Sequence, residues 1–438
     1  MKRQQPKTPA TVAKAELDLP GWPAVGERDR RGRSRRRLAD GLARTQARLN
    51  RVARTEPSPF GQRPKLAGAT PALPRPIESR VYRLASLALA LLAIAAASAA
   101  DFRGCQFLGC DRFDDWEKTP GPATNQWCLT SPPFEAGLEW DELVLSWNAD
   151  TPPSTGLKFE VRVTEPPPAT RFYTLGLWAT DAAQQPRESV RNQKDERGEV
   201  QTDTLVLTQP ARAAQVRVTF TGSDATARPA LRFIGLSVCD RHAQLEPLAP
   251  NRAAWGRDLP VPERTQVIYP EGVSAWCSPT SLSMLLAFWA EKLDRRDLDL
   301  EVPAVAAAVN DPQWPGTGNW AFNVAFAGSL PGVRAFVARL SDISELEDWI
   351  AAGVPVAASV SYSLLRGQPR EPADGHLVVV RGFTATGDPI VNDPGTGHEI
   401  RRVFPRANLA RAWAVSHNTV YVVRPLNVPS PAARFGHW

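Results

Sequence analysis

The 438-residue sequence lacks two features that would mark a nucleotide-driven membrane transporter. It has no glycine-rich phosphate-binding loop, which argues against a P-loop nucleotide hydrolase domain. It also has no succession of long apolar runs: the leucine- and alanine-rich run Leu84–Ala100 is 17 residues long, shorter than the roughly 20 residues that span a bilayer. A sequence of this length can form two or three globular domains.

A nucleic-acid-binding surface is not indicated either, although the net charge is +6. Residues 1–83 carry 20 Lys and Arg against 7 Asp and Glu, whereas residues 84–438 carry 32 against 39. The positive charge is therefore confined to an N-terminal tail with too few apolar residues to bury a core, and we expect this tail to be disordered. No nucleic acid, no metal and no cofactor are expected.

The run Leu84–Ala100 has the character of an export signal. It ends in the small residues Ala97–Ala100, where signal peptidase requires them, so we expect cleavage near Ala99 or Ala100 and a secreted, periplasmic or cell-envelope protein. About eighty residues are too many to precede such a signal. We therefore expect translation to start near Val81, which makes Val81–Arg83 the start of the signal and residues 1–80 no part of the natural protein; the alternative is a signal anchor with a basic cytoplasmic tail.

Cysteine is scarce, and its distribution agrees with export. Cys105, Cys110, Cys128 and Cys239 all precede the last segment of the chain, and we expect disulfide bonds among them. Four cysteines can pair in three ways, and the sequence does not decide among these. The fifth, Cys277, would remain a free thiol, as a nucleophile requires.

Residues 101–242 predict an all-β sandwich, because short alternating segments are separated there by Pro, Gly and Asp clusters. The long polar loop 181–203 is expected either to be mobile or to lie against a neighbouring domain. Exposed aromatic residues in such a domain could contact a cell-surface glycan, although packing in the core is their more ordinary role. The candidates are Trp140, Trp147, Tyr173 and Trp178. The expected strands are 143–147, 157–164, 171–178, 204–208, 215–221 and 231–238.

A linker rich in Pro, Ala and Arg, residues 243–260, leads to a domain of mixed pattern, residues 261–425, and a tail, residues 426–438. Helices that carry a cysteine, packed on a sheet that carries a histidine and an acid, make an α+β arrangement. Helices are expected after Cys277, near 303–310 and near 344–352, and strands at 354–361, 376–383, 389–392 and 419–423.

Cys277 stands at the predicted start of a helix. Pro279 suits a first helical turn, where an amide hydrogen has no partner, and apolar residues from Leu282 to Trp289 recur at the spacing of a buried face. The unpaired amides and the positive end of the helix dipole favour a thiolate at such a position. Further along, His376 opens one predicted strand and Asp393 follows another, so the order is cysteine, histidine, acid.

The segment 258–425 resembles the papain-like bacteriocin-processing (double-glycine leader) peptidases, the thirty-ninth family of cysteine peptidases, and more closely their stand-alone secreted bacterial relatives. The resemblance extends weakly into the β domain, at 147–153. It implies a papain-like α+β fold preceded by the β-sandwich. The matching motifs are Gln266–Pro270, Trp276–Ser281, Gly318–Asn323, Gly375–Leu377 and Val391–Pro394.

The resemblance implies a catalytic role for four residues. Cys277 would be the nucleophile, His376 the general base and later acid, and Asp393 the residue that orients the imidazole. Gln266 would donate a hydrogen bond to the oxyanion. The leader specificity of transporter-linked relatives is not implied, because these residues contain neither their membrane nor their nucleotide-binding segments.

We therefore expect a secreted cysteine peptidase-like hydrolase that cleaves peptide or amide bonds through a Cys-His-Asp triad and a thioester acyl-enzyme. Its partner would be a peptide or protein substrate. The alternative is an exported cell-surface binding protein with an inactive papain-like domain. A cysteine sulfur within hydrogen-bond reach of the imidazole would favour the enzyme.

Overall fold

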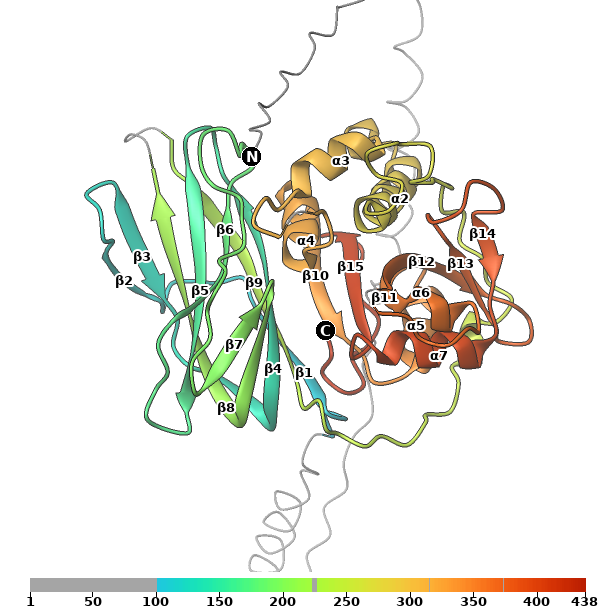
Figure 1. The fold of residues 1–438 in the computed structure, drawn as a ribbon, viewed down its shortest axis with the longest axis horizontal. Coiled ribbons are helices and arrows are strands. Elements are labelled where there is room, and N and C mark those ends of the chain that lie inside the picture. Colours follow the sequence, from blue (N-terminus) through green and yellow to red (C-terminus); the bar gives the residue numbers. More distant parts are fainter. Residues whose placement is uncertain (1–100, 223–226, 315, 373) are drawn as a thin grey trace, which may run out of the picture. The chain divides into compact units, whose positions relative to one another are not determined.

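The computed structural model describes residues 101–222, 227–314, 316–372 and 374–438. The basic tail and the predicted signal segment 84–100 lie outside the described residues. The described residues all belong to one compact unit, which contains a β domain and a mixed α/β domain (Figure 1). None of the helices within these ranges has the length and apolar character that crossing a bilayer requires.

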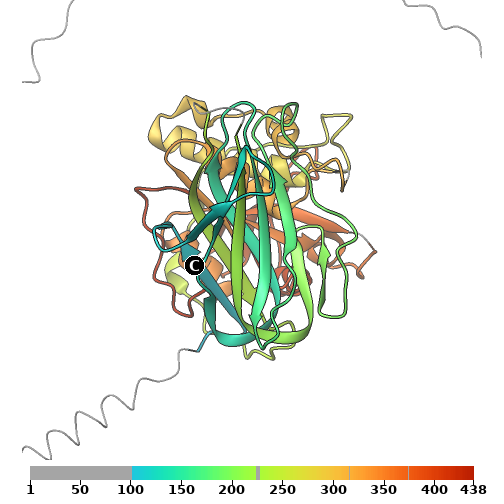
Figure 2. The same cartoon turned by 90° about the vertical axis from the view of Figure 1, so that its left-hand side faces the viewer.

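The β domain is a single sheet of nine antiparallel strands that curls over its own core (Figure 2). Strand β8 is long enough to pair with β4 and β7 through its first half and with β3 and β5 through its second half. Across the core, the ring of Trp147 on β4 stacks on that of Phe159 on β5, with centroids 4.1 Å apart. The strands are β1 (Cys105–Cys110), β2 (Glu117–Pro120), β3 (Gln126–Thr130), β4 (Phe134–Asp150), β5 (Gly156–Glu165), β6 (Tyr173–Trp178), β7 (Gly198–Gln201), β8 (Thr204–Thr221) and β9 (Ala230–Cys239).

The curled sheet confirms the predicted all-β domain and corrects two details of it. Segments 204–208 and 215–221, expected as separate strands, are the two halves of β8. The four aromatic residues considered for sugar stacking are at most 1% exposed and fill the core, so their more ordinary role is confirmed and the stacking alternative is wrong for them. They are Trp140, Trp147, Tyr173 and Trp178.

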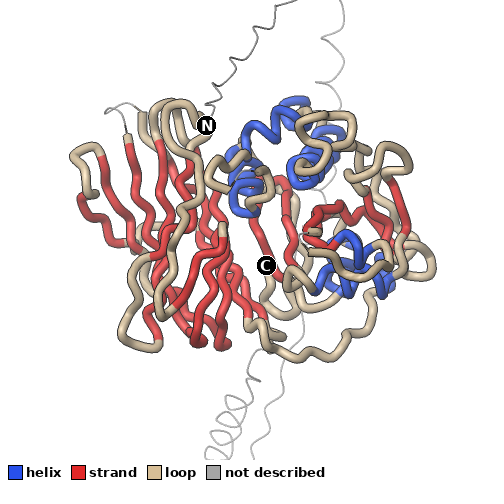
Figure 3. Tube along the Cα trace, viewed as in Figure 1, coloured by secondary structure: helices blue, strands red, loops and turns tan. Residues whose placement is uncertain are grey.

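The second domain is built on a six-stranded antiparallel sheet in the order β10-β15-β11-β12-β13-β14. Its helices gather in two groups, α2–α4 and α5–α7, which are separated by the strands in Figure 3. The strands are β10 (Val333–Arg339), β11 (Val356–Ser361), β12 (Gly375–Phe383), β13 (Pro389–Asn392), β14 (Arg401–Val403) and β15 (Thr419–Pro425). The helices are η1 (Arg252–Ala254), α2 (Cys277–Leu293), η2 (Arg296–Leu298), α3 (Val302–Val309), α4 (Trp320–Ser329), α5 (Ile343–Ala351), α6 (Tyr362–Leu365) and α7 (Arg406–Ala414). This α+β architecture agrees with the predicted fold class.

Helix α4 joins the two domains because its buried side chains divide between their cores. Ala321, Phe322 and Ala325 belong to the core of the β domain, whereas Val324 and Ala327 belong to that of the second domain. The Phe322 ring lies 6.2 Å from that of Trp147 and 5.6 Å from that of Trp178, centroid to centroid. A Cβ atom on Gly176 would approach the Phe322 ring to 2.9 Å, so the absence of a side chain there makes room for it. On β4, Asn148 donates to and accepts from the backbone of Ala335 on β10.

Three predicted loops are held on the second domain. The loop 181–203 lies against its neighbour, as one of the two expected alternatives: the Arg187 guanidinium donates to the Ala307 carbonyl at 2.7 Å. Within the predicted linker, the indole of Trp255 donates to Glu347 at 2.7 Å. In the predicted tail, His437 is fully buried between Glu345 and the Phe102 carbonyl.

Candidate active site

Cys277 is the first residue of α2, as its sequence setting predicts. Pro279 falls in the first turn, where it removes no hydrogen bond, and the helix is buried from Ser278 to Ala290. The Ser281 hydroxyl donates to the Leu377 carbonyl on β12 at 3.1 Å. This bond fixes the start of α2 beside the start of β12, where His376 lies.

His376 and Asp393 come together because β12 and β13 are antiparallel neighbours. His376 Nε2 lies 2.8 Å from Asp393 Oδ1, and both side chains are buried. The backbone amide of Gly395 also donates to Oδ1, at 3.0 Å, so the turn after β13 orients the carboxylate. Three segments far apart in sequence therefore converge at one point.

Two further residues hold Asp393, and sequence reasoning missed both. The Tyr362 hydroxyl donates to Asp393 Oδ2 at 3.0 Å, and the Arg402 guanidinium does so at 3.2 Å. The Tyr362 ring also packs against the His376 imidazole, with centroids 4.2 Å apart. Neither residue lies in a motif: Tyr362 begins a four-residue helix and Arg402 lies on a three-residue strand.

The charges in this cluster favour a thiolate beside an imidazolium. Burial alone would raise the pKa of the Cys277 thiol, but the hydrogen bond and charge of His376, together with backbone amides, bring it below its ordinary value. Burial opposes protonation of His376, yet hydrogen bonds to Asp393 and Cys277 raise its pKa to about 9. Burial would likewise raise the pKa of the Asp393 carboxyl, but the hydrogen bond with His376 keeps that pKa below its ordinary value.

Gln266, the predicted oxyanion donor, is buried near the site but does not line the cleft that contains Cys277. Its Nε2 donates to the Val273 carbonyl at 2.8 Å, so one of its two N–H groups is already used. Its Oε1 is buried without a hydrogen-bond partner among the described residues. The oxyanion role of Gln266 stays a prediction.

A cleft of about 670 Å³ opens over Cys277 and His376. Gly318 and Trp320 line it, and the neighbouring Asn319 caps α4 by accepting from the Phe322 amide at 3.1 Å. The motif Gly318–Asn323 thus builds the cleft wall. A neighbouring wall comes from the β domain, through the β7–β8 hairpin and Arg241.

Two family models match the chain. One is described as the peptidase C39 N-terminal domain and matches residues 116–239. The other is described as the peptidase C39-like family and matches residues 258–421, which include the clustered cysteine, histidine and aspartate. The chain belongs to the C39-like peptidases. The family predicted from the motifs is therefore confirmed, whereas its stand-alone secreted branch stays a prediction. The β domain of this C39-like chain corresponds to the domain described as the peptidase C39 N-terminal domain.

Other comparisons add little to the description of this C39-like chain. No curated protein matches it. Among solved structures, it is similar to an N-terminal endo-1,4-β-D-xylanase 10B of Clostridium thermocellum, comprising CBM22-1 and GH10 modules complexed with xylohexaose. The identity is 11%, the match covers 36% of this chain and 31% of that chain, and the TM-score is 0.13. A likeness this weak carries no inference.

A second group of reactive side chains lies where the two domains meet. The ligand-type atoms of Glu142, Cys239 and His417 are all within 4.8 Å of one another, a spacing that a metal ion would tolerate. However, the buried Arg339 guanidinium contacts both Glu142 and the Cys239 sulfur, the latter at 3.1 Å. A protein cation therefore already balances this group, and the fit to a metal is poor.

All five cysteines are free thiols in the structure, so the expected disulfide bonds are not present in it. Cys105 and Cys239 are nevertheless direct neighbours across β1 and β9. Cys128 faces Thr219 across β3 and β8, and Cys110 is paired with Ile234. Neither of these two lies opposite a cysteine.

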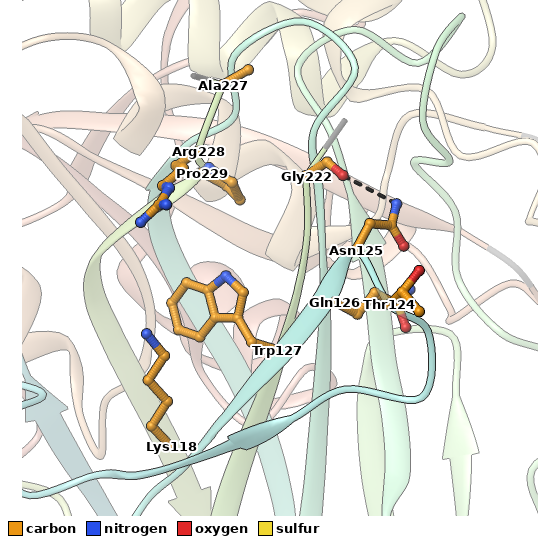
Figure 4. A pocket seen from close by; sticks show the side chains of 9 residues that line it. All are labelled: Lys118, Thr124, Asn125, Gln126, Trp127, Gly222, Ala227, Arg228 and Pro229. Atoms are coloured by element: carbon orange, nitrogen blue, oxygen red, sulfur yellow. Dashed lines mark hydrogen bonds between the residues drawn. The ribbon is translucent and has the colours of Figure 1, made fainter. Parts of the chain in front are cut away.

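An open pocket on the β domain contains the partly exposed aromatic residue Trp127 (Figure 4). Its indole stacks on Phe220 with centroids 3.7 Å apart, and the Lys118 ammonium lies 4.6 Å from the ring centroid. Since parallel stacking covers one face, the ammonium has to lie over the other. Neither face of the ring is open to a sugar, so this pocket gives no support for glycan stacking.

Proposed function

We propose that this C39-like chain is a cysteine hydrolase of peptide or amide bonds, with Cys277, His376 and Asp393 as its catalytic triad. The observation that carries the proposal is the convergence of the three side chains at one cleft. His376 Nε2 is 2.8 Å from Asp393, Cys277 and His376 line the same cleft, and the imidazole lowers the pKa of the Cys277 thiol. A thiolate and an imidazolium paired in this way are the reactants that acyl transfer to sulfur requires.

In the first half of the reaction, the Cys277 thiolate attacks the scissile carbonyl carbon and forms a tetrahedral intermediate. The backbone amide of Cys277, which has no partner within the helix, is available to the developing oxyanion, with Gln266 as the second donor to be tested. His376 then gives its proton to the leaving amine as the C–N bond breaks. The product of this step is a thioester between Cys277 and the acyl part of the substrate.

In the second half, neutral His376 takes a proton from water, and the resulting hydroxide attacks the thioester carbonyl. The C–S bond breaks, the carboxylic acid leaves, and the thiolate–imidazolium pair is restored. Asp393 keeps the imidazole in the required orientation throughout, since Tyr362, Arg402 and Gly395 hold both of its oxygens.

The test uses reduced protein, a peptide library and a thiol-directed alkylating probe. Cys277→Ala is expected to abolish cleavage and labelling at residue 277, while Cys128→Ala, which removes a thiol facing Thr219, is expected to leave both unchanged. Cleavage that persists in Cys277→Ala would contradict the proposal. A folded wild-type protein that cleaves nothing would favour the alternative of an exported binding protein.

We also propose that the protein is exported through the segment Leu84–Ala100, on the evidence of its sequence alone. N-terminal sequencing of the mature protein is expected to begin just after Ala99 or Ala100. A mature chain that still contained peptides from residues 1–75 would rule out both the cleavage and the start near Val81.

A further inference from the structure

The cleft over Cys277 is assembled from both domains, and the β domain supplies a complete wall. Gln201, Thr202, Asp203, Thr204 and Val206 line it from the hairpin that joins β7 to β8. Thr202, at the tip, has a positive φ of 62°, as tight two-residue hairpins require. The cleft volume of about 670 Å³ is large enough for a ligand of several chemical groups and exceeds what a single amide group would fill.

A short series of contacts fixes this hairpin relative to the nucleophile. Asp203 accepts a hydrogen bond from the Trp320 amide at 2.5 Å, at the start of α4. Three residues earlier, the Thr317 hydroxyl donates to the Ala275 carbonyl at 2.9 Å, two residues before Cys277. The hairpin therefore cannot move independently of the loop that carries Cys277, and its distance from the thiol is set by the fold.

The charged side chains that line this side of the cleft already have partners within the protein. On the hairpin itself, Asp203 is buried and accepts hydrogen bonds from the Trp320 amide and the Thr204 hydroxyl. Arg241 contacts Asp141 through its Nε and a terminal nitrogen, at 3.0 and 2.9 Å. Glu142 contacts Arg339 and, at 3.0 Å, His417. A wall whose charges are satisfied within the protein offers little to a charged side chain and favours uncharged ones.

We infer that the β7–β8 hairpin is a substrate-binding wall, and that the substrate is an extended polypeptide whose side chains facing the hairpin are uncharged. This inference rests on the proposed function. It assigns the β domain a direct part in substrate selection, at positions away from the bond that is cleaved.

The test compares Gln201→Lys with Gln209→Lys. Both glutamines are exposed on the β domain, but Gln201 lines the cleft and Gln209 does not. Gln201→Lys is expected to lower kcat/KM for library peptides about fivefold and to shift selection toward acidic residues, since a charge is placed in the cleft. Gln209→Lys is expected to match wild type. Alkylation of Cys277 by iodoacetamide is expected to be equal in all three proteins.

Peptide binding is measured in parallel with each lysine substitution placed in the Cys277→Ala background. Weaker binding by the Gln201→Lys protein supports the wall even where cleavage is absent, which separates this inference from the proposed function. Identical selection and binding by the Gln201→Lys and Gln209→Lys proteins would overturn it.

A different observation supports a second inference, at Cys105 and Cys239. These residues are partners in the β1–β9 register, and the adjacent hydrogen bond from the Asp240 amide to the Gly104 carbonyl places them at a non-hydrogen-bonded position. At such positions the Cα atoms are about 4.5 Å apart, within the range that a disulfide spans. Each of these thiols is also the largest influence on the pKa of the other.

The geometry points to a Cys105–Cys239 disulfide that forms in an oxidising medium. The Cys239 thiolate attacks one sulfur of a small disulfide such as glutathione disulfide and expels a thiolate. The Cys105 thiolate then attacks the Cys239 sulfur of the mixed disulfide and releases the second thiol. Two protein thiols are oxidised, one disulfide is reduced, and the two protons pass to the released thiols. Both cysteines line a cavity of about 210 Å³.

Peptide mapping after equilibration with reduced and oxidised glutathione tests this pairing. The expected product is a cross-linked peptide that contains Cys105 and Cys239. Oxidation is also expected to raise Tm by about 5 °C in wild type and in Cys128→Ser, but not in Cys105→Ser. Any other internal pairing, full alkylation of both cysteines in the oxidising buffer, or a stoichiometric metal on Glu142, Cys239 and His417 would overturn it.

Discussion

The molecule contains two clusters of cysteine, histidine and carboxylate, and they are connected differently. At the candidate active site, His376 lies between Cys277 and Asp393, so the imidazole can exchange a proton with the thiol while the carboxylate orients the ring. In the second cluster the carboxylate is central: Glu142 contacts both His417 and Arg339, and Arg339 contacts Cys239. The same residue types therefore yield a reactive series in one place and a balanced ion-pair network in the other.

Access differs as well. Cys277 is partly buried and lines the cleft, whereas Cys239 is only 1% exposed and lies against Cys105. The pKa of Cys239 is lowered to about 7, chiefly by its hydrogen bond with Cys105, with Arg339 adding to the effect. A lowered thiol pKa is thus common to both clusters, and it is the placement of the histidine and the open cleft that single out Cys277.

Removing each histidine in turn is the strongest test of whether the two clusters differ in their part in cleavage. His376→Ala is expected to reduce kcat/KM for peptide cleavage by about 10³-fold, because it removes both the general acid and the partner of the thiolate. His417→Ala is expected to leave the rate within about twofold of wild type, since His417 contacts Glu142 and not the nucleophile. Equal losses in steady-state assays would mean that the second cluster takes part in catalysis.

The second comparison concerns stability. Arg339→Met is expected to lower the free energy of unfolding by about 3–5 kcal/mol, because it leaves the buried Glu142 carboxylate without its guanidinium. Arg402→Met is the matched control: its side chain is 35% exposed, and a loss of at most about 1 kcal/mol is expected. Urea unfolding followed by tryptophan fluorescence measures both. A wild-type value for Arg339→Met would show that the network is dispensable.

The pH profile of cleavage should follow the active-site pair alone. The pKa of Cys277 is lowered, so the rate is expected to rise with pH at values below the ordinary titration of a thiol. The pKa of His376 is raised to about 9, so the imidazolium persists to that value and the rate is expected to fall above it. An alkaline limb that begins near pH 6.5, the ordinary value for histidine, would contradict the ion pair.

The smallest expected effect comes from Tyr362→Phe. The substitution removes one hydrogen bond to Asp393 Oδ2 and leaves the ring packed on His376. A loss of about 1 kcal/mol, or roughly fivefold in kcat, is expected, with KM unchanged. Tyr173→Phe is the matched control, because it also removes one hydroxyl that donates to a carboxylate, that of Asp195 in the β domain.

The residues with local signals were predictable. Cys277 could be placed at a helix start from Pro279 and the apolar spacing that follows, and His376 and Asp393 from the strands beside them. Tyr362 could not be placed, because it reaches Asp393 only through the pairing of β11 with β12 and the short helix after β11. Local patterns do not encode contacts of this kind.

The same limit explains what was missed or wrong in the β domain. The pairing of β1 with β9 places Cys105 beside Cys239, although the two stand near opposite ends of that domain's sequence. No sequence motif predicts this pairing. The aromatic residues considered for sugar binding were expected mainly in the core, but the sequence did not predict that Phe322 of α4 would join them there. The linker and tail are rich in Pro, Ala and Arg, but their hydrogen bonds to Glu345, Glu347 and Asp348 hold them in place.

The position of Phe322 has a practical consequence for anyone who wishes to recombine these peptidases. Because this side chain from α4 fills a space between Trp147 and Trp178, a fragment that stops at residue 242 would leave that space empty and apolar surface open to water. A chimera that exchanges the β domain for that of a relative must therefore exchange α4 with it. The boundaries of the exchanged segments thus lie within the peptidase domain and not between the two domains.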